Sequence, residues 1–158
     1  MSNNNLITHS GVLDSPVRIA IVASRFNSFV VDKLYQGAID FLQQHNVQAE
    51  DILTVKVPGA FEIPVAVKSL LELNKYDAIV TLGAVIRGET PHFEYICNEC
   101  AHGISRLALD YSVPVIFGVL TVDTTEQALD RAGEEESNKG AESAAAALEM
   151  IGVLRQVG

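Results

Sequence analysis

The first unit of structure in the chain is VRIAIVASRFNSFVVDKLYQGAIDFLQQH, residues 17–45. Residues 17–23 are short, mostly apolar and rich in β-branched side chains, which is typical of a strand buried on both faces. Residues 28–45 carry apolar side chains such as Phe29, Leu34 and Phe41 at helical spacing, and Asn27 or Ser28 can cap that helix. The stretch predicts a strand followed directly by a helix.

The same alternation continues to the end of the chain. Apolar runs predict further strands at 52–57, 78–86 and 113–120, and helical patterns cover 60–73, 93–111, 124–132 and 140–154. Strands that alternate with helices form βαβ units, which gives an α/β fold of three layers around a four-stranded parallel sheet. Ligands of such sheets bind outside the carboxyl ends of the strands. We therefore expect the site at residues 24–28, 58–62, 87–92 and 121–125.

Length and composition limit what the protein can be. The 158 residues, of which 48% are hydrophobic and 20% charged, predict one globular domain over 1–158 with an N-terminal tail at 1–14. The tail either frays or adds to the sheet of a neighbouring subunit through Leu6 and Ile7. A net charge of −9 argues against binding to nucleic acid or to an anionic membrane. Without a signal-peptide pattern or a membrane span, the expected location is the cytoplasm.

Residues 83–90 read G-x-x-x-x-G-E-T. The segment differs from the phosphate loop of nucleotide hydrolases mainly by Glu89, which stands where that loop needs a lysine. Because a carboxylate repels terminal phosphates, we exclude a nucleoside triphosphatase. Two interpretations remain. Either a glycine turn brings helix N–H groups and the Thr90 hydroxyl to one phosphate or carboxylate, or the turn binds nothing.

Other side chains also allow a functional and a structural interpretation. His92 follows that turn and has the pKa range for proton transfer, or it caps the helix at the surface. Phe26 either stacks on a planar heterocycle or covers the core. Glu62 either accepts hydroxyl hydrogen bonds or favours its helix N-terminus. Arg131 lies in an acidic stretch, where the ordinary interpretation is an i, i+4 pair with Glu135 or Gln127.

Cys97 and Cys100 form a C-x-x-C inside a predicted helix. A redox motif of that kind places its first cysteine at a helix N-terminus, and a structural zinc site needs four ligands. We therefore expect buried, inert thiols and no metal.

Taken together, these segments resemble the lumazine synthase (6,7-dimethyl-8-ribityllumazine synthase) family of riboflavin biosynthesis. The resemblance runs in order from residue 17 to the C-terminus. The matching stretches are 25–27 (RFN), 57–64 (VPGAFEIP), 82–92 (LGAVIRGETPH), 117–121 (FGVLT), 131–133 (RAG) and 138–142 (NKGAE).

The resemblance implies a flavodoxin-like three-layer sandwich and a transferase of the penultimate step of that pathway. The family condenses 5-amino-6-(D-ribitylamino)uracil with L-3,4-dihydroxy-2-butanone 4-phosphate to 6,7-dimethyl-8-ribityllumazine, phosphate and water, without a cofactor. His92 would then be the catalytic proton carrier. The implied contacts to the pyrimidine and its ribityl chain are Phe26, Ala60, Phe61, Glu62, Ala84, Val85, Ile86 and Phe117. The implied contacts to the butanone phosphate are Glu89, Thr90 and Arg131, with Asn27 and Lys139 near the phosphate pocket.

The resemblance also implies partners. Phe117 and Arg131 would come from the adjacent copy of a homo-oligomer, a pentamer that is either free or assembled into a sixty-subunit shell. The acidic turn at 133–137 leaves that choice open, and riboflavin synthase is a further expected partner. The alternative is a non-catalytic flavin or lumazine binding module of flavodoxin-like fold. Such a carrier needs the stacking Phe26 but has no use for both His92 and Arg131.

Overall fold

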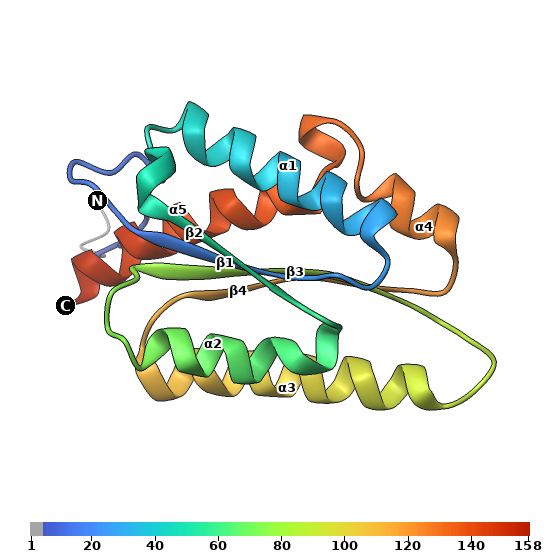
Figure 1. Ribbon diagram of the computed structural model, residues 1–158. Coiled ribbons are helices and arrows are strands. Elements are labelled where there is room, and N and C mark those ends of the chain that lie inside the picture. The colour runs from blue at the N-terminus through green and yellow to red at the C-terminus, as the bar shows by residue number, and fades with distance from the viewer. Residues whose placement is uncertain (1–4) are drawn as a thin grey trace.

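The computed structural model describes residues 5–158, with the backbone alone for Glu135. Four parallel strands form one sheet in the order β2-β1-β3-β4, and their carboxyl ends share one edge, on the right of Figure 1. The strands are β1 (Ile19–Ser24), β2 (Ile52–Val57), β3 (Ala78–Ile86) and β4 (Val115–Val122). The parallel four-stranded α/β architecture expected from the sequence is confirmed, and it is consistent with a flavodoxin-like fold.

Helices cover both faces of the sheet and give the molecule its three layers (Figure 1). One face carries α1 (Ser28–Gln44), α4 (Thr125–Asp130) and α5 (Lys139–Val157), and the other carries α2 (Ile63–Leu71) and α3 (His92–Tyr111). Short 3₁₀ turns precede β2 (η1, Ala49–Asp51), α2 (η2, Ala60–Glu62) and α5 (η3, Glu135–Ser137).

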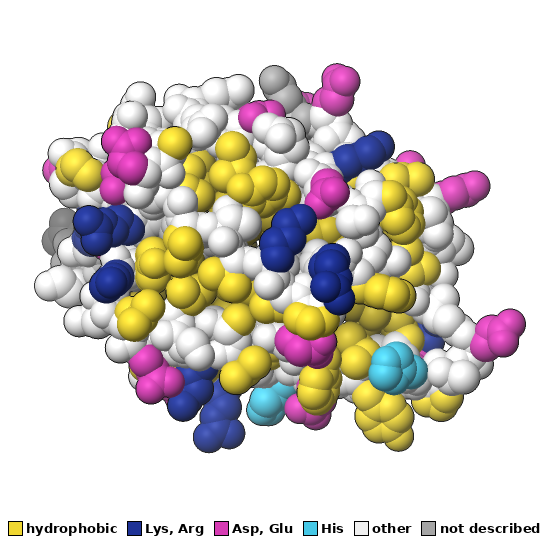
Figure 2. All heavy atoms as spheres, viewed as in Figure 1, with side chains coloured by type: hydrophobic (Ala, Val, Ile, Leu, Met, Phe, Trp, Pro, Cys, Tyr) yellow, Lys and Arg dark blue, Asp and Glu magenta, His cyan; other side chains and the backbone are white. Residues whose placement is uncertain are grey.

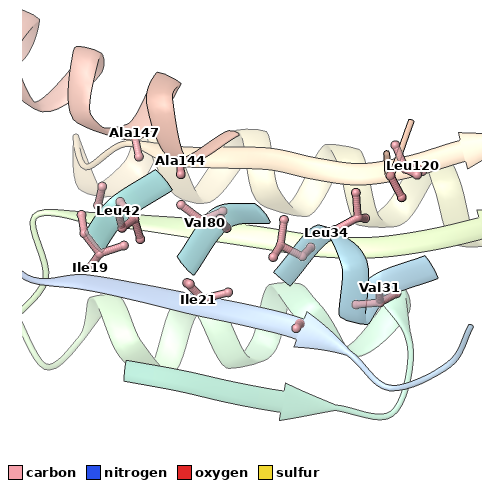
Figure 3. Packing of buried hydrophobic residues seen from close by; sticks show 14 of the residues in the cluster. Ile19, Ile21, Val31, Leu34, Leu42, Val80, Leu120, Ala144 and Ala147 are labelled. Atoms are coloured by element: carbon pink, nitrogen blue, oxygen red, sulfur yellow. The ribbon is translucent and has the colours of Figure 1, made fainter. Parts of the chain in front are cut away.

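Alternation along the strands divides the core into two halves. Ile19 and Ile21 of β1 point toward α1 and α5, whereas Ala20 and Val22 point toward α2 and α3. Figure 3 shows the first half, in which Leu34 and other residues of α1 meet the sheet and the small side chains of α5. All six residues of β1 are buried, so the central strands have the continuous apolar character expected of a parallel sheet.

α1 and α5 approach closely where α5 begins. Gly140 is buried there, and a Cβ atom at this position would overlap the carbonyl oxygen of Leu34. Asn138, also buried, caps α5 by accepting from the N–H of Ala141 at 3.0 Å, and its Nδ2 donates to the carbonyl oxygen of Lys33 at 3.0 Å. The start of the last helix is therefore fixed to the middle of the first.

The predicted bounds of β2 and β3 are confirmed, and several others need correction. β4 begins at Val115 instead of Val113, because Pro114 has no N–H to donate to a ladder. The helix predicted over 60–73 begins as the turn η2, and α2 itself spans Ile63–Leu71. Pro64 is tolerated only in the first turn of an α-helix, so α2 begins just before it. β1, α1, α3, α4 and α5 differ from their predicted bounds by one to three residues at one or both ends.

The N-terminal tail runs beside the last turns of α5. The carbonyl oxygen of Thr8 accepts from Gln156 Nε2 at 3.1 Å, and Ser15 Oγ accepts from Arg155 Nη1 at 3.0 Å. Residues 1–4 of the predicted tail lie outside the described residues. Leu6 and Ile7 are exposed, and the pairing of this segment with a neighbouring sheet stays a prediction.

The edge strand β2 faces the viewer in Figures 1 and 2. Hydrophobic side chains gather over the centre of this face, between the two helical layers, with basic side chains around them. Leu53 of β2 is among the exposed large hydrophobic residues. Within residues 5–158, no helix combines the length and the apolar character needed to cross a bilayer.

Candidate active site

The loop after β1 is joined to the loop after β2 by backbone hydrogen bonds. Arg25 N donates to Val57 O at 2.7 Å, and Phe26 N donates to Pro58 O at 3.0 Å. These bonds extend the pairing of β1 and β2 beyond the sheet and hold Phe26 above the ends of the strands. The side chain of Phe26 is 71% exposed, so it does not cover the core, and its ring is available for stacking.

Asn27 connects the same loop to β3. Its backbone is left-handed, with φ of 62°, a conformation that asparagine tolerates better than most residues. Its Nδ2 donates to the carbonyl oxygen of Ala84 at 2.8 Å. Asn27, one of the two predicted candidates, occupies the N-cap position of α1, but its side chain makes no capping bond. The side-chain amide of Asn27 therefore holds the loop against β3 and does not cap the helix.

These loops surround a cavity of about 600 Å³ at the carboxyl edge of the sheet. It lies in the region where ligands of open α/β sheets bind, and its size is typical of small-molecule sites. Glu62 is half-buried there on η2, and it places a carboxylate in a lining that is otherwise largely apolar. Most of the predicted site residues line this cavity, namely Phe26, Asn27, Ala60, Phe61, Glu62, Ala84, Val85, Ile86, Thr90 and His92.

His92 is the first residue of α3 and lies at the rim of the cavity. Pro91 occupies the N-cap position before it, and the N–H of His92 donates to Thr90 Oγ1 at 3.4 Å. The imidazole is exposed and does not pack into the core. An exposed histidine beside a cavity can exchange protons with both a bound molecule and water.

The glycine turn considered for residues 83–90 is shorter than that span. Gly83 and Ala84 lie within β3, the exposed turn occupies residues 87–91, and α3 begins only at His92. Gly83 is required for close packing, because a Cβ atom there would come within 2.9 Å of Ser24 Oγ. Thr90 lies on the turn and lines the cavity, and Glu89 lies on the same turn but does not line it.

A cluster of charged side chains links the start of this turn to the end of β4 and to the first turn of α3. Arg87 Nε donates to Asp123 Oδ1 at 2.8 Å, and Arg87 Nη1 donates to Glu94 Oε1. The guanidinium also lies over the ring of Phe93, 4.4 Å from the ring centre. The hydrogen bond from Arg87 lowers the pKa of Glu94, so its carboxylate stays charged at more acidic pH than an isolated glutamate.

The remaining predicted residues lie around a second hollow, of about 470 Å³, at the β4 edge. Phe117 of β4, Arg131 after α4 and Lys139 at the start of α5 line it, and none of the three lines the first cavity. Arg131 Nη1 donates to the carbonyl oxygen of Gln127 at 2.9 Å, which confirms one of the two expected neighbours. The side chain of the other, Glu135, lies outside the described residues. Lys139 Nζ lies 3.2 Å from Glu142 Oε1.

The two cysteines lie in the middle of α3, as expected. Cys100 is fully buried, and burial raises the pKa of its thiol to about 12. Cys97 is half-buried, not buried as expected, and its partial burial also raises the pKa of its thiol. Such thiols are poor nucleophiles near neutral pH.

A comparison with protein-family models identifies the relationship. The model of 6,7-dimethyl-8-ribityllumazine synthase matches residues 16–155. The chain belongs to this family. The match covers all four strands and all five α-helices, up to the last turn of α5. Membership of the lumazine synthase family places the chain among transferases of riboflavin biosynthesis.

Several residues that line the cavity were not singled out from the sequence of this lumazine synthase family member. Phe93 and Ile96 line the cavity from the first two turns of α3, and Gly88 and Arg25 line it from the loops. Phe93 and Ile96 are three positions apart on a helix that begins at the expected site, so helical spacing after His92 could have identified them. The contact of Arg87 with Asp123 joins residues 36 positions apart, and no local sequence pattern signals it.

Proposed function

We propose that this chain condenses 5-amino-6-(D-ribitylamino)uracil with L-3,4-dihydroxy-2-butanone 4-phosphate to form 6,7-dimethyl-8-ribityllumazine, with release of phosphate and water. The observation that carries the proposal is the cavity at the carboxyl edge of the sheet. There, Phe26, the η2 turn, the end of β3 and His92 meet, although they come from four separate segments. The family match supports the same reaction.

The lining suggests how the pyrimidine is bound. Phe26 is exposed above the cavity and stacks on the heterocycle, while the backbone of Ala84, Val85 and Ile86 borders the ring. Glu62 accepts hydrogen bonds from ribityl hydroxyls, with Ala60 and Phe61 beside it. Asn27 keeps the Phe26 loop in register with β3 through its bond to Ala84.

In the proposed reaction, the substrate amine attacks the ketone itself, so the protein has to position two molecules and move protons. Holding the two reactants together removes their translational freedom before the reaction. This can lower the activation barrier by about 7–11 kcal/mol. His92 at the rim transfers protons during imine formation, loss of phosphate and ring closure. Thr90 and the turn that carries Glu89 receive the phosphate end of the butanone.

A complete site requires a second copy of the chain. Phe117, Arg131 and Lys139 line the hollow at the β4 edge, away from the cavity that holds His92. We propose that the β4 edge of one subunit covers the cavity of the next, so that Arg131 binds the phosphate. Such a head-to-tail contact closes into a ring, and the family resemblance favours five copies. The proposed location is the cytoplasm.

The non-catalytic carrier is the weaker candidate. Stacking on Phe26 and hydroxyl binding by Glu62 would serve a carrier equally well, but a carrier needs no proton-transferring His92 beside the ring. The deciding experiment mixes the purified protein with both substrates and follows the fluorescence of the lumazine product, with each substrate omitted in turn. Product formation that requires both substrates and protein supports the enzyme. Binding of product without turnover would support the carrier.

A further inference from the structure

The segment between β3 and α3 is not fixed by burial. Every residue from Arg87 to His92 is exposed, and a Cβ atom added at Gly88 would meet no other atom within 4 Å. Figure 1 shows the segment extending beyond the carboxyl edge of the sheet. It nevertheless carries Thr90 and ends at His92, two residues whose positions the proposed reaction depends on.

Arg87 connects this exposed segment to two secondary-structure elements. Its Nε bonds Asp123, which directly follows β4, and its Nη1 bonds Glu94 in the first turn of α3. Its own N–H donates to Val122 O at 2.9 Å, so the backbone of Arg87 is already fixed to the sheet. One guanidinium thus fastens the first turn of α3 to the ends of β3 and β4.

The residues that Arg87 contacts lie next to His92 and to the lining of the cavity. Glu94 is two residues after His92, and Phe93, which lies under the guanidinium at 4.4 Å, lines the cavity. The planar guanidinium can bond two carboxylates in fixed directions while it stacks on a ring, which an ammonium group cannot do. Any movement of the first turn of α3 would displace His92 and Phe93 together.

We propose that Arg87 is a positioning residue, whose bonds to Asp123 and Glu94 hold Thr90 and His92 in place against the cavity without touching substrate. The inference rests on the proposed function, because it is that reaction which requires Thr90 and His92 to be in place. A displacement of about 1 Å at a reacting group can reduce turnover about 10²-fold. Exposed ion pairs add little to global stability, so the effect should be local.

The test compares three variants that break the cluster with a matched control. Arg87→Gln removes both bonds, Asp123→Asn weakens one and Glu94→Gln weakens the other. Arg106→Gln is the control, because Arg106 is an exposed arginine of α3, paired with Asp110 at 3.6 Å and remote from the cavity. We expect kcat to fall about 10- to 100-fold in Arg87→Gln and by less in each carboxylate variant. The control should retain wild-type turnover, and thermal midpoints should stay within about 2–4 °C of wild type.

Amide hydrogen exchange provides a readout that is independent of turnover. We expect exchange over residues 88–94 to accelerate in Arg87→Gln and to remain unchanged in Arg106→Gln. In the Asp123→Asn background, Arg87→Gln should cost less than it does in the wild type, because the two residues share one interaction. Arg87→Lys should restore turnover only in part, since it keeps the charge but loses the second bond.

Two results would overturn the inference. The first is wild-type kcat and wild-type exchange in Arg87→Gln. The second is a large loss in Arg87→Gln with no loss in Asp123→Asn and Glu94→Gln, which would show direct contact with substrate. If the wild-type protein forms no lumazine at all, the proposed function fails, and the exchange data then decide separately whether the cluster orders the segment.

Discussion

Single side chains carry the proposed chemistry, and His92 is the one whose loss is simplest to interpret. It begins α3 at the rim of the cavity, is exposed and supports no part of the core. We expect His92→Ala to lower kcat by about 10²–10⁴-fold while KM for both substrates changes little, because a proton carrier is removed and an anchor is not. Steady-state kinetics measured from pH 5 to 9, in steps of about 1 pH unit, would test this. Wild-type turnover at every pH would contradict the assignment.

Arg131 gives a second prediction at this scale. It is exposed after α4 and bonds the carbonyl oxygen of Gln127, so as a surface residue it would contribute only about 0–1 kcal/mol. As a phosphate anchor it makes a charge-assisted bond of about 1.5–3 kcal/mol, equivalent to about a 10- to 160-fold change in affinity. Arg131→Ala should therefore raise KM for the phosphorylated ketone and leave pyrimidine binding nearly unchanged. Equal effects on both substrates, or none, would show that Arg131 has a structural role only.

Among the secondary-structure elements, the contact between α1 and α5 depends on Gly140. A side chain there would overlap the carbonyl oxygen of Leu34, and backbone cannot move aside as a flexible side chain can. We expect Gly140→Ala to lower the free energy of unfolding by about 1–3 kcal/mol, measured by urea denaturation. Gly88→Ala is the control, because its Cβ would enter open space and should leave stability unchanged. Equal stability of the two variants would contradict the close approach of the helices.

The middle of α3 predicts an alkaline limit to stability. Cys100 is buried, its thiol has a pKa of about 12, and the neutral form is the one the fold accommodates. An unfolded thiol ionises near pH 8.5, so above that value the unfolded state binds fewer protons than the folded state. The contribution of Cys100 is complete below about pH 8.5 and is lost progressively as pH rises toward 12. Urea denaturation of Cys100→Ala between pH 7 and about 10.5 should show a flatter pH dependence than wild type. An unchanged slope would mean that other groups determine it.

The elements also show why sequence patterns predicted so much of this fold. β2 and β3 were predicted at their observed bounds because each is an apolar run with a clear break at its end. β4 was misplaced by two residues because Val113 and Pro114 are as apolar as the strand itself. The sequence places Gly83 both in the strand predicted over 78–86 and in the glycine turn considered over 83–90, and the structure has it inside β3, where it allows close packing. The sequence alone does not distinguish a glycine that is needed for close packing from a glycine that is needed for a turn.

The candidate site also contains residues that the sequence predicts and contacts that it does not. Residues that follow strands, such as Phe26, Glu62 and His92, were identified because parallel strands bring their carboxyl ends together. The contacts of Arg87 with Asp123 and of Asn27 with Ala84 join residues 36 and 57 positions apart, which only the folded chain reveals.

For the molecule as a whole, the separation of the two hollows makes activity a property of neighbouring chains. Assayed with the phosphorylated ketone near its wild-type KM, Phe26→Ala and Arg131→Ala chains should each have little activity alone, because each lacks one part of every site. Refolded together in equal amounts, they should regain about a quarter of the wild-type activity, since about one site in four joins two intact halves in a head-to-tail ring. Sedimentation velocity on the same mixture should show ring-sized oligomers and no monomer. Full activity of a monomer would contradict the shared site.

The tie between the first and the last helix has a consequence for how the protein is made. Asn138 reaches Lys33 across 105 positions of sequence, and α5 supplies the surface that covers α1. At about 5–20 residues per second, a ribosome would complete α1 roughly 5–20 s before α5 becomes available. During that interval the face of α1 that carries Leu34 and Ala38 has no covering helix, although both residues are fully buried in the finished protein. The nascent chain should therefore be a client for chaperones until synthesis is nearly complete, and premature termination before residue 139 should yield aggregates instead of a smaller folded domain.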